Sequence, residues 1–401
     1  MIGWARVKLR DLYEVHNGLS KSRKFFGHGH PFLTFSTVFN HFFLPENLGS
    51  SVESTPEEQL SFSIKRGDVF ITRTSETAEE LGMSAVALID YPQATYNGFC
   101  KRLRPISDCR ILPEYAGYVL RAPEFRTRFY GLAGSMTSRA SLRNDDLLEM
   151  DIPLPELSVQ RKVSKCLSDY DSAIDNARRQ IALLEEAAMR LYREWFDGTG
   201  KGWKRTPVVL ADVLERLGTG LNPRKNFTLG HGENFYVTIK NMANNRVYLD
   251  SKCDKVDDEA IRKINRRSDL RKGDVLFSGI GTIGRAYLIA EAPKNWNTSE
   301  SVFNLRANSR ITPEFLYMLM LSSKMQQYAM NNATGCAQKG IRAAALRAYQ
   351  FDLAPLIEIE KFTEQVRPML NAVNDLNKKI DSLTEARDRL LPKLMSGEIE
   401  V

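Results

Sequence analysis

Two stretches of the chain carry apolar residues at a heptad spacing over five successive heptads. In the first stretch the two apolar positions hold Val163, Tyr170, Ala177, Leu184 and Leu191, and Leu167, Ile174, Ile181, Ala188 and Trp195. In the second they hold Phe362, Met369, Leu376, Leu383 and Leu390, and Val366, Val373, Ile380, Arg387 and Leu394. A narrow stripe of this period is typical of helices that pair in a coiled coil. The pattern therefore predicts two long helices, over 158–198 and 357–401, that pair with each other.

Three features interrupt or end these predicted helices. Arg387 is the one charged residue among the repeated positions. Pro368 removes one backbone hydrogen bond, so we expect a kink there or a helix whose regular part starts there. Glycines at 198, 200 and 202 end the first helix.

If the helices pair, the chain runs out along one and back along the other, so they are antiparallel. The alternative is two amphipathic helices that lie separately on their own domains.

The remaining sequence alternates short β-type runs with helical segments. Runs with β-branched or alternating apolar residues lie at 9–13, 68–72, 85–89, 274–277 and 286–289. Segments 114–130 and 314–328 each follow a proline and read as helices. These patterns predict globular parts of the α+β class.

The chain also repeats itself at an offset of about 200 residues. Four pairs of segments correspond: 7–26 with 208–227, 64–74 with 270–280, 111–120 with 311–320, and 142–154 with 341–353. We therefore expect two similar mixed domains, at 1–157 and 199–356, separated by the two long helices and related by a pseudo-two-fold axis.

Composition and charge fit a globular protein that binds a polyanion. The chain has 401 residues, 43% of them hydrophobic, and a formal net charge of +7. The basic surplus lies outside the two long helices, so we expect the globular domains to meet the polyanion. No apolar run reaches the ~18 residues of a membrane span and the N-terminus lacks a signal peptide's apolar core, so we expect a cytoplasmic protein.

Basic residues gather in predicted loops of both copies, and several occupy matching positions. Matching pairs are Arg23 with Arg224, Lys24 with Lys225, and Arg143 with Arg342. A single loop cation is more often only solvated, but repeated pairs favour phosphate contacts. The residues predicted to contact the phosphates or bases of a nucleic acid are Lys21, Arg23, Lys24, Arg139, Arg143, Arg224, Lys225, Asn226, Lys339 and Arg342. Amides that could read base edges are Asn226, Asn241, Asn332 and Gln338.

Motifs for catalysis or for a resident cofactor are weak. The five cysteines are scattered and never spaced as C-x-x-C, and His28 and His30 lack a third ligand nearby, so we expect no metal site. Gly279, Gly281 and Gly284 match the G-x-G-x-x-G fingerprint, but a short β-type run and Pro293 follow them instead of a helix. We interpret the triplet as a turn, whose glycines let it bend close to the backbone of a polyanion.

Taken together, these features resemble the specificity subunit of type I DNA restriction-modification systems. The resemblance is carried by the tandem copies, by Arg66-Gly-Asp-Val-Phe and Lys272-Gly-Asp-Val-Leu, by the junction at 152–174 leading into a long helix, and by the ending at 391–401. The resemblance covers essentially the whole chain. It departs at 353–362, which lacks the doubled proline of the first junction, and at Pro368.

The resemblance implies a division of labour among subunits. Each globular domain would be a target recognition domain that reads one half of a split DNA sequence, and the paired helices would act as a spacer. Two modification subunits that methylate adenine with S-adenosylmethionine would dock on the spacer helices, and restriction subunits that use ATP and Mg would join them. This chain would contribute no catalytic residue, cofactor or metal.

Two other classes of function remain open at this point. The chain could be a non-enzymatic coiled-coil adaptor with two similar domains that bind ligands other than DNA. It could also be a nucleotide-dependent enzyme that uses the stretch from Gly279 to Gly284.

Overall fold

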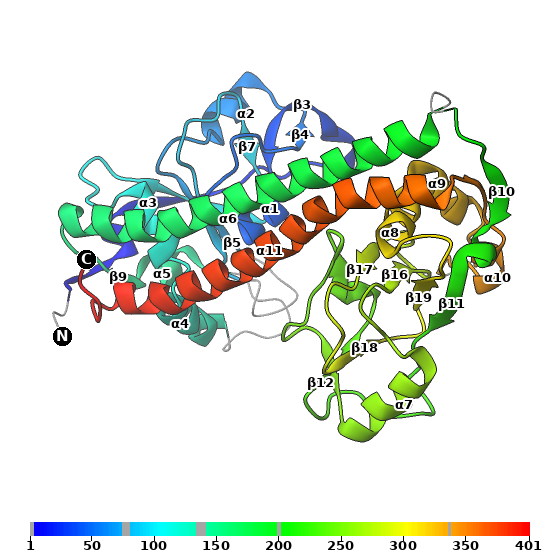
Figure 1. Cartoon of the computed structure of the whole chain (residues 1–401). Helices are drawn as coiled ribbons and strands as arrows, with labels where there is room; N and C mark the ends of the chain where they lie inside the picture. The colour runs from blue at the N-terminus through cyan, green and yellow to red at the C-terminus, as the bar shows by residue number, and fades with distance from the viewer. Residues whose placement is uncertain (1–3, 74–80, 134–141, 199–201, 336–337) are drawn as a thin grey trace. The chain divides into compact units, whose positions relative to one another are not determined.

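The structure is a computed structural model that describes residues 4–73, 81–133, 142–198, 202–335 and 338–401. The chain divides into two compact units, one of residues 1–175 and 380–401 and the other of residues 176–379. Each unit contains one globular part and a section of both long helices (Figure 1).

The first unit is built on a four-stranded antiparallel sheet of order β2-β8-β5-β6. Its strands are β2 (Tyr13–Asn17), β8 (Cys100–Pro105), β5 (Val69–Thr72) and β6 (Ser84–Val86). Both faces of this sheet are covered, because β5 is buried along its whole length. Its side chains alternate between the two faces. Val69 enters the core shared with α3 (Pro113–Val119), whereas Phe70 enters the core shared with α1 (Phe35–Asn40).

The second unit repeats this sheet with the order β11-β19-β16-β17. Its strands are β11 (Leu214–Thr219), β19 (Val302–Ala307), β16 (Val275–Ser278) and β17 (Ala286–Leu288). Val275 and Leu276 again enter different cores. The recurrence of the same strand order confirms the internal repeat.

Two smaller sheets complete each globular part. A three-stranded sheet has order β4-β3-β7 in the first unit and β15-β12-β18 in the second, with one antiparallel and one parallel pairing in each. The strands are β4 (Ser51–Val52), β3 (Phe26–Leu33), β7 (Thr95–Tyr96), β15 (Asp254–Val256), β12 (Asn234–Val237) and β18 (Trp296–Thr298). Two-stranded sheets join β1 (Arg6–Lys8) to β9 (Asp151–Pro153), and β10 (Thr206–Val209) to β20 (Gln350–Leu353). A hairpin of β13 (Met242–Ala243) and β14 (Arg246–Val247) is added in the second unit.

The predicted strand at 9–13 is wrong. Leu9–Asp11 forms a 3-10 turn, and β2 begins only at Tyr13. The backbone N–H of Leu12 donates to the Leu9 oxygen at 3.1 Å, which closes a turn at this place instead of an extended strand.

The predicted helices at 114–130 and 314–328 are each divided in two. The first consists of α3 and α4 (Pro123–Ala133), and the second of α8 (Pro313–Leu321) and α9 (Ser323–Asn331). Pro123 cannot donate a backbone hydrogen bond, so it starts a new helix. In the second copy, the Ser322 hydroxyl accepts from Met325 N at 3.3 Å and caps α9.

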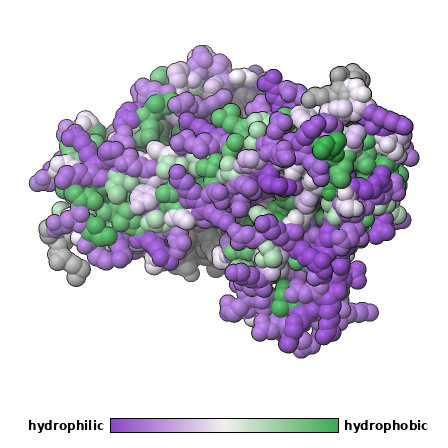
Figure 2. All heavy atoms as spheres, in the orientation of Figure 1, coloured by the Kyte–Doolittle hydropathy of each residue, from purple (hydrophilic) through white to green (hydrophobic). Residues whose placement is uncertain are grey.

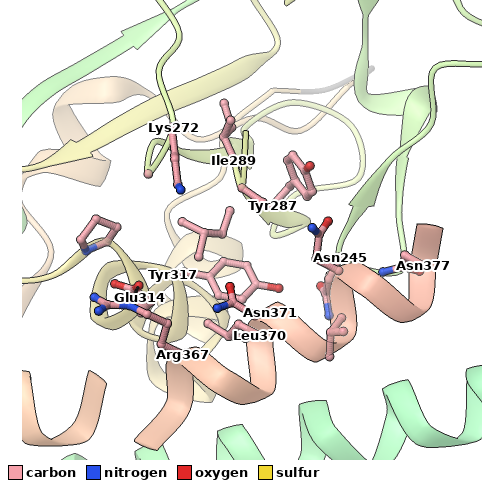
Figure 3. A pocket seen from close by; sticks show the side chains of 16 residues that line it. Asn245, Lys272, Tyr287, Ile289, Glu314, Tyr317, Arg367, Leu370, Asn371 and Asn377 are labelled. Carbon is pink, nitrogen blue, oxygen red and sulfur yellow. Dashed lines mark hydrogen bonds and ion pairs between the residues drawn. The ribbon is translucent and has the colours of Figure 1, made fainter. Parts of the chain in front are cut away.

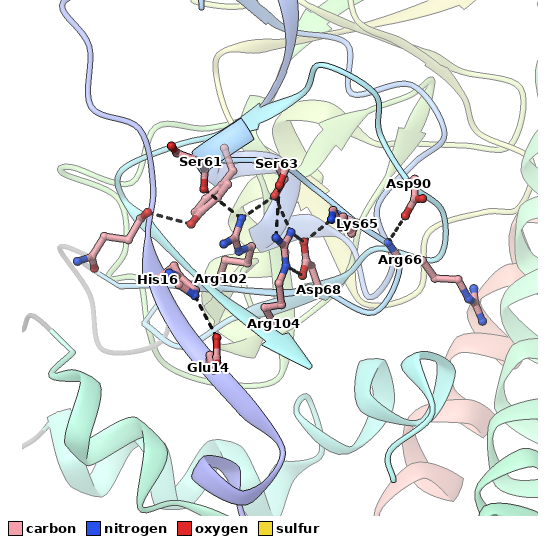
Figure 4. Close-up of polar contacts among 12 residues, drawn as sticks. Glu14, His16, Ser61, Ser63, Lys65, Arg66, Asp68, Asp90, Arg102 and Arg104 are labelled. Carbon is pink, nitrogen blue, oxygen red and sulfur yellow. Dashed lines mark hydrogen bonds and ion pairs between the residues drawn. The ribbon is translucent and has the colours of Figure 1, made fainter. Parts of the chain in front are cut away.

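The Gly-Asp-Val signature is structural in both units. Asp68 is buried and accepts from Arg104 Nε at 2.8 Å, Arg104 Nη2 at 2.6 Å and Lys65 N at 2.8 Å (Figure 4). Asp274 accepts in the same way from Arg306 Nε at 2.7 Å, Arg306 Nη2 at 2.9 Å and Arg271 N at 2.9 Å. These hydrogen bonds raise the pKa of Arg104 and of Arg306. We call each arrangement an Asp–Arg clasp. It ties the turn before β5 to β8 in the first unit, and the turn before β16 to β19 in the second unit.

The two long helices are α6 (Leu157–Tyr192), which continues as a π-helical turn over Arg193–Asp197, and α11 (Leu356–Met395). In the first unit, Asp171 of α6 contacts Arg387 of α11. In the second unit, the ring of Tyr192 of α6 lies 6.1 Å from that of Phe362 of α11. In the first unit, the N-terminal part of α6 therefore meets the C-terminal part of α11. In the second unit, the C-terminal part of α6 meets the N-terminal part of α11. The two helices pair in antiparallel fashion.

The residues at the predicted heptad positions lie on the covered faces of these helices. The buried ones are Val163, Leu167, Ile174, Ala177, Ala188, Phe362, Val366, Ile380 and Leu394. The half-buried ones are Tyr170, Ile181, Leu184, Leu191, Trp195, Met369, Val373, Leu376, Leu383, Arg387 and Leu390. Pro368 does not start the regular part of the second helix, because α11 begins at Leu356 and remains helical through Pro368.

The glycine triplet forms the turn of a hairpin. β16 and β17 pair antiparallel on either side of it, so the crossover helix of a dinucleotide fold is absent at this place. A Cβ on Gly279 would lie 2.2 Å from the Phe303 ring, and one on Gly284 would lie 2.0 Å from Gln326 Oε1. Packing within the second unit therefore accounts for these glycines without a ligand.

Candidate nucleic-acid interface

The Lys21 side chain makes its contacts within the first unit. Its Nζ pairs with Glu58 Oε2 at 2.6 Å and donates to the backbone oxygen of Glu53 at 2.7 Å. The hydrogen bond from Lys21 lowers the pKa of Glu58. Lys21 therefore holds its loop against α2 (Pro56–Ser61), and its predicted role as a free cation does not fit these contacts.

Arg23 and Lys24 lie beside Lys21 but point to solvent. Both are exposed on the 3-10 turn Arg23–Phe25. Lys24 Nζ lies 4.9 Å from the centre of the Phe25 ring, which limits its motion without neutralising its charge. These two side chains are therefore exposed cations on one short turn.

Arg143 is exposed at the N-cap of α5 (Asn144–Leu148), while Arg139 lies outside the described residues. The neighbouring Asn144 accepts from Lys101, which also shares Asn17 Oδ1 with Arg73. Lys101 is buried, and burial lowers its pKa. Lys101 and Arg73 therefore belong to one polar cluster with Asn17 and Asn144.

One loop of the second unit exposes Arg224, Lys225 and Asn226. Hydrogen bonds to Asn222 stabilise this loop. The Asn222 side-chain oxygen accepts from Arg224 N at 3.0 Å, and its backbone oxygen accepts from Asn226 Nδ2 at 2.7 Å. The loop is therefore fixed by its own hydrogen bonds while its cations remain exposed.

Lys339 and Arg342 are exposed beside the glycine hairpin. The backbone oxygen of Lys339 accepts from Gly281 N at 2.9 Å, and Arg342 is the N-cap of α10 (Ala343–Arg347). Of the amides predicted to read bases, Asn332 and Gln338 are exposed as well. Asn241 is buried and accepts from Thr238 N at 3.0 Å, so it serves the fold and is not available to read a base.

A basic helix that the sequence reasoning missed lies next to the Arg224 loop. α7 (Asp258–Ser268) exposes Arg262, Lys263, Arg266 and Arg267. Lys263 Nζ reaches the backbone oxygen of Asn226 at 3.5 Å, which brings helix and loop together. We call Arg224, Lys225 and the exposed cations of α7 the α7 surface. Figure 2 shows that hydrophilic residues cover this part of the second unit almost completely.

A pocket of about 550 Å³ in the second unit is lined by amide and apolar side chains together with Lys272, Glu314 and Arg367 (Figure 3). β17, α8 and α11 form its walls, and amides of α11 such as Asn371 and Asn377 point into it. Its ionic contact is an internal pair, from Arg367 Nε to Glu314 Oε1 at 2.5 Å. The glycine hairpin does not line it, and no cluster of three metal-binding side chains occurs among the described residues.

Within the described part of the chain, no helix has the length and apolar character needed to cross a membrane. The long helices α6 and α11 are amphipathic and carry charged side chains along their exposed faces.

Comparison with known proteins gives full-length relatives. The type I restriction enzyme MjaIX specificity subunit of Methanocaldococcus jannaschii is 21% identical over 422 aligned positions, covering 99% of this chain and 94% of the relative. The putative type I restriction enzyme MjaX specificity subunit of the same organism is 22% identical over 419 positions, with the same coverage.

A solved structure shares the fold. The crystal structure of the type I restriction-modification system S subunit from M. genitalium superposes with a TM-score of 0.58 at 13% identity, covering 98% of this chain and 96% of that one. The profile of the type I restriction modification DNA specificity domain matches residues 1–186 and again residues 201–384. The chain therefore belongs to the family of type I restriction modification DNA specificity domains and carries two copies of that domain.

Proposed function

We propose that this chain is the sequence-recognition subunit of a type I restriction-modification complex, and that each unit reads one half of a bipartite DNA target. The observation that supports this most strongly is the repeated fold with exposed cations at matching positions, Arg23 with Arg224 and Arg143 with Arg342. A phosphate backbone is recognised by such cations, whereas base edges determine the sequence that is chosen.

The paired helices α6 and α11 would set the gap between the two half-sites and dock two modification subunits. Two similar units in one chain suit two copies of one partner, since each copy can meet an equivalent surface. Restriction subunits would join through the modification subunits. S-adenosylmethionine, ATP and Mg would all be bound by these partners, and this chain would act by binding alone.

The relatives are named as specificity subunits of restriction enzymes, which agrees with this proposal and gives no support to an adaptor of non-DNA ligands. The glycine hairpin likewise gives no support to a nucleotide-dependent enzyme.

Selection from a pool of random duplexes tests the proposal. The chain is assembled with a modification subunit from its own host and used to enrich bound duplexes at two salt concentrations. The proposal expects one target of two short defined blocks separated by an undefined gap. Enrichment of no sequence, or affinity that hardly changes with salt, contradicts it.

A further inference from the structure

α7 marks the clearest chemical difference between the two units. It lies between β15 and β16 in the second unit, and α2 lies between β4 and β5 in the first, so the two helices occupy equivalent places in the repeat. α2 has six residues, with Glu57 and Glu58 in its first turn and no basic residue in its last. α7 has eleven residues and likewise has two acidic residues, Asp258 and Glu259, in its first turn, but it carries Arg266 and Arg267 in its last turn. The repeat therefore keeps the position of the helix and reverses its charge.

The inner face of α7 is fixed firmly to the second unit. Ala260, Ile261 and Ile264 are buried in a core with Tyr236 and Val256. That core also holds the partly buried side chains that flank the Arg224 loop. Helix and loop are therefore supported by one core, and this fixes their exposed cations relative to each other.

Both ends of α7 are also held by polar contacts. Asp257 caps the helix by accepting from Ala260 N at 2.7 Å. Near the other end, Asn265 Oδ1 accepts from Asn297 Nδ2 at 2.7 Å, and Arg267 Nε donates to the Gly220 oxygen at 3.0 Å. The backbone of α7 is thus ordered before any ligand arrives, which lowers the entropy cost of binding.

The outer cations of α7 make only weak contacts. Arg262 Nε donates to the backbone oxygen of Asp258 at 2.9 Å, and Lys263 pairs with Glu259 one turn away at 2.7 Å. Exposed contacts of this kind contribute little to stability, so a stronger anionic ligand can replace them. Arg262 and Arg266 are four residues apart and share one face of the helix.

We infer that α7 lies in the major groove of the second half-site, where Arg262 and Arg266 read base edges while Arg224 and Lys225 hold the phosphate backbone. This inference rests on the proposed function. The major groove admits an α-helix, and arginine forms paired hydrogen bonds with guanine O6 and N7. Because α2 is acidic, the first unit reads its half-site with another element.

The test uses the assembled complex and the target defined by selection. Binding of duplexes with either half-site scrambled is measured for the wild type, for Arg262→Gln with Arg266→Gln, and for Arg262→Lys with Arg266→Lys. The lysine variant keeps the charge but loses the paired hydrogen bonds of arginine. Arg310→Gln with Lys324→Gln is the matched control, since both residues are exposed on the second unit and are not part of α7.

We expect the glutamine variant to bind the target at least ~10-fold more weakly. The lysine variant should keep most of its affinity but tolerate a scrambled second half-site, and both variants should still reject a scrambled first half-site. Discrimination of the second half-site equal to wild type in both variants overturns the inference. A wild-type complex without sequence preference overturns the proposed function itself.

Discussion

Arg387 Nη1 of α11 donates to Asp171 Oδ1 of α6 at 2.6 Å, at the one position where the heptad pattern has a charge. Asp171 also accepts from Tyr118 Oη at 2.6 Å, and the Arg387 guanidinium lies 5.1 Å from the centre of the Phe42 ring. Burial, reinforced by the hydrogen bond to Asp171, raises the pKa of Tyr118. This network joins both long helices to the globular part of the first unit.

Asp171→Ala should lower the free energy of unfolding by about 2 kcal/mol, because a hydrogen bond to a charged group contributes about 1.5–3 kcal/mol. Urea unfolding of the full chain measures it. Lys165→Ala on the same helix is the control, since its pair with Asp169 is exposed and should contribute little. Equal stability of the Asp171 variant and the control would show that the network is unimportant.

The Asp–Arg clasps should be required separately by each unit. Asp68→Asn removes the charged partner of Arg104 and should cost about 3 kcal/mol, as expected when one member of a buried pair is removed. Asp274→Asn should do the same to the second unit. Hydrogen exchange resolved by peptide distinguishes them, since each variant should lose protection mainly in its own unit. An equal loss of hydrogen-exchange protection in both units would contradict separate roles for the two clasps.

Glu185 predicts a pH dependence of stability. Burial raises its pKa, and a hydrogen bond from Asn245 at 3.0 Å partly opposes this. As pH rises through the ordinary glutamate range, the unfolded chain loses this proton before the folded chain does, so the free energy of unfolding falls. Glu185→Gln should remove that fall while keeping the hydrogen bond. The free energy of unfolding is measured at several pH values between about pH 4 and 7. The same dependence on pH in wild type and variant would be inconsistent with this assignment.

The exposed cations Arg23 and Lys24 of the first unit should behave differently from Lys21, which makes contacts within the unit. Arg23→Gln with Lys24→Gln should weaken DNA binding by the assembled complex and leave the melting temperature unchanged. Lys21→Met should lower the melting temperature, because it removes the ion pair with Glu58. Calorimetry and a binding titration on the same samples separate the two effects. A melting temperature unchanged by Lys21→Met would show that its contacts do not support the loop.

Periodic features were predictable from the sequence because they repeat a local rule many times. The heptads of 158–198 and 357–401 anticipated α6 and α11, and the matched Gly-Asp-Val stretches anticipated β5 and β16. Boundaries set by single side chains were not predictable. The breaks at Pro123 and Ser322 depend on one missing donor and one capping hydroxyl inside otherwise helical patterns.

The candidate interface was only partly predictable for a related reason. Arg224 and Lys225 stood out because the first copy has equivalents at Arg23 and Lys24. α7 has no basic equivalent in the first copy, so a search by repetition passes over it. Lys21 shows the opposite error, since the sequence around it cannot reveal that Glu58 would take up its charge.

The spacer idea makes its own prediction. Seven residues inserted between 175 and 176 of α6, with seven more between 379 and 380 of α11, keep the heptads in phase and lengthen each helix by ~10 Å. The gap between half-sites should then grow by about three base pairs. An insertion in α6 alone should disrupt pairing and DNA binding. An unchanged gap after matched insertions would rule out the helices as the spacer.

Mapping methylated adenines tests the central claim most directly. Genomic DNA is compared from cells that produce the modification subunit with this chain and from cells that produce it alone. Recognition by this chain predicts methylation at one bipartite sequence with a fixed gap, present only when the chain is present. Methylation that is independent of the chain, or that follows a single continuous sequence, would contradict the account.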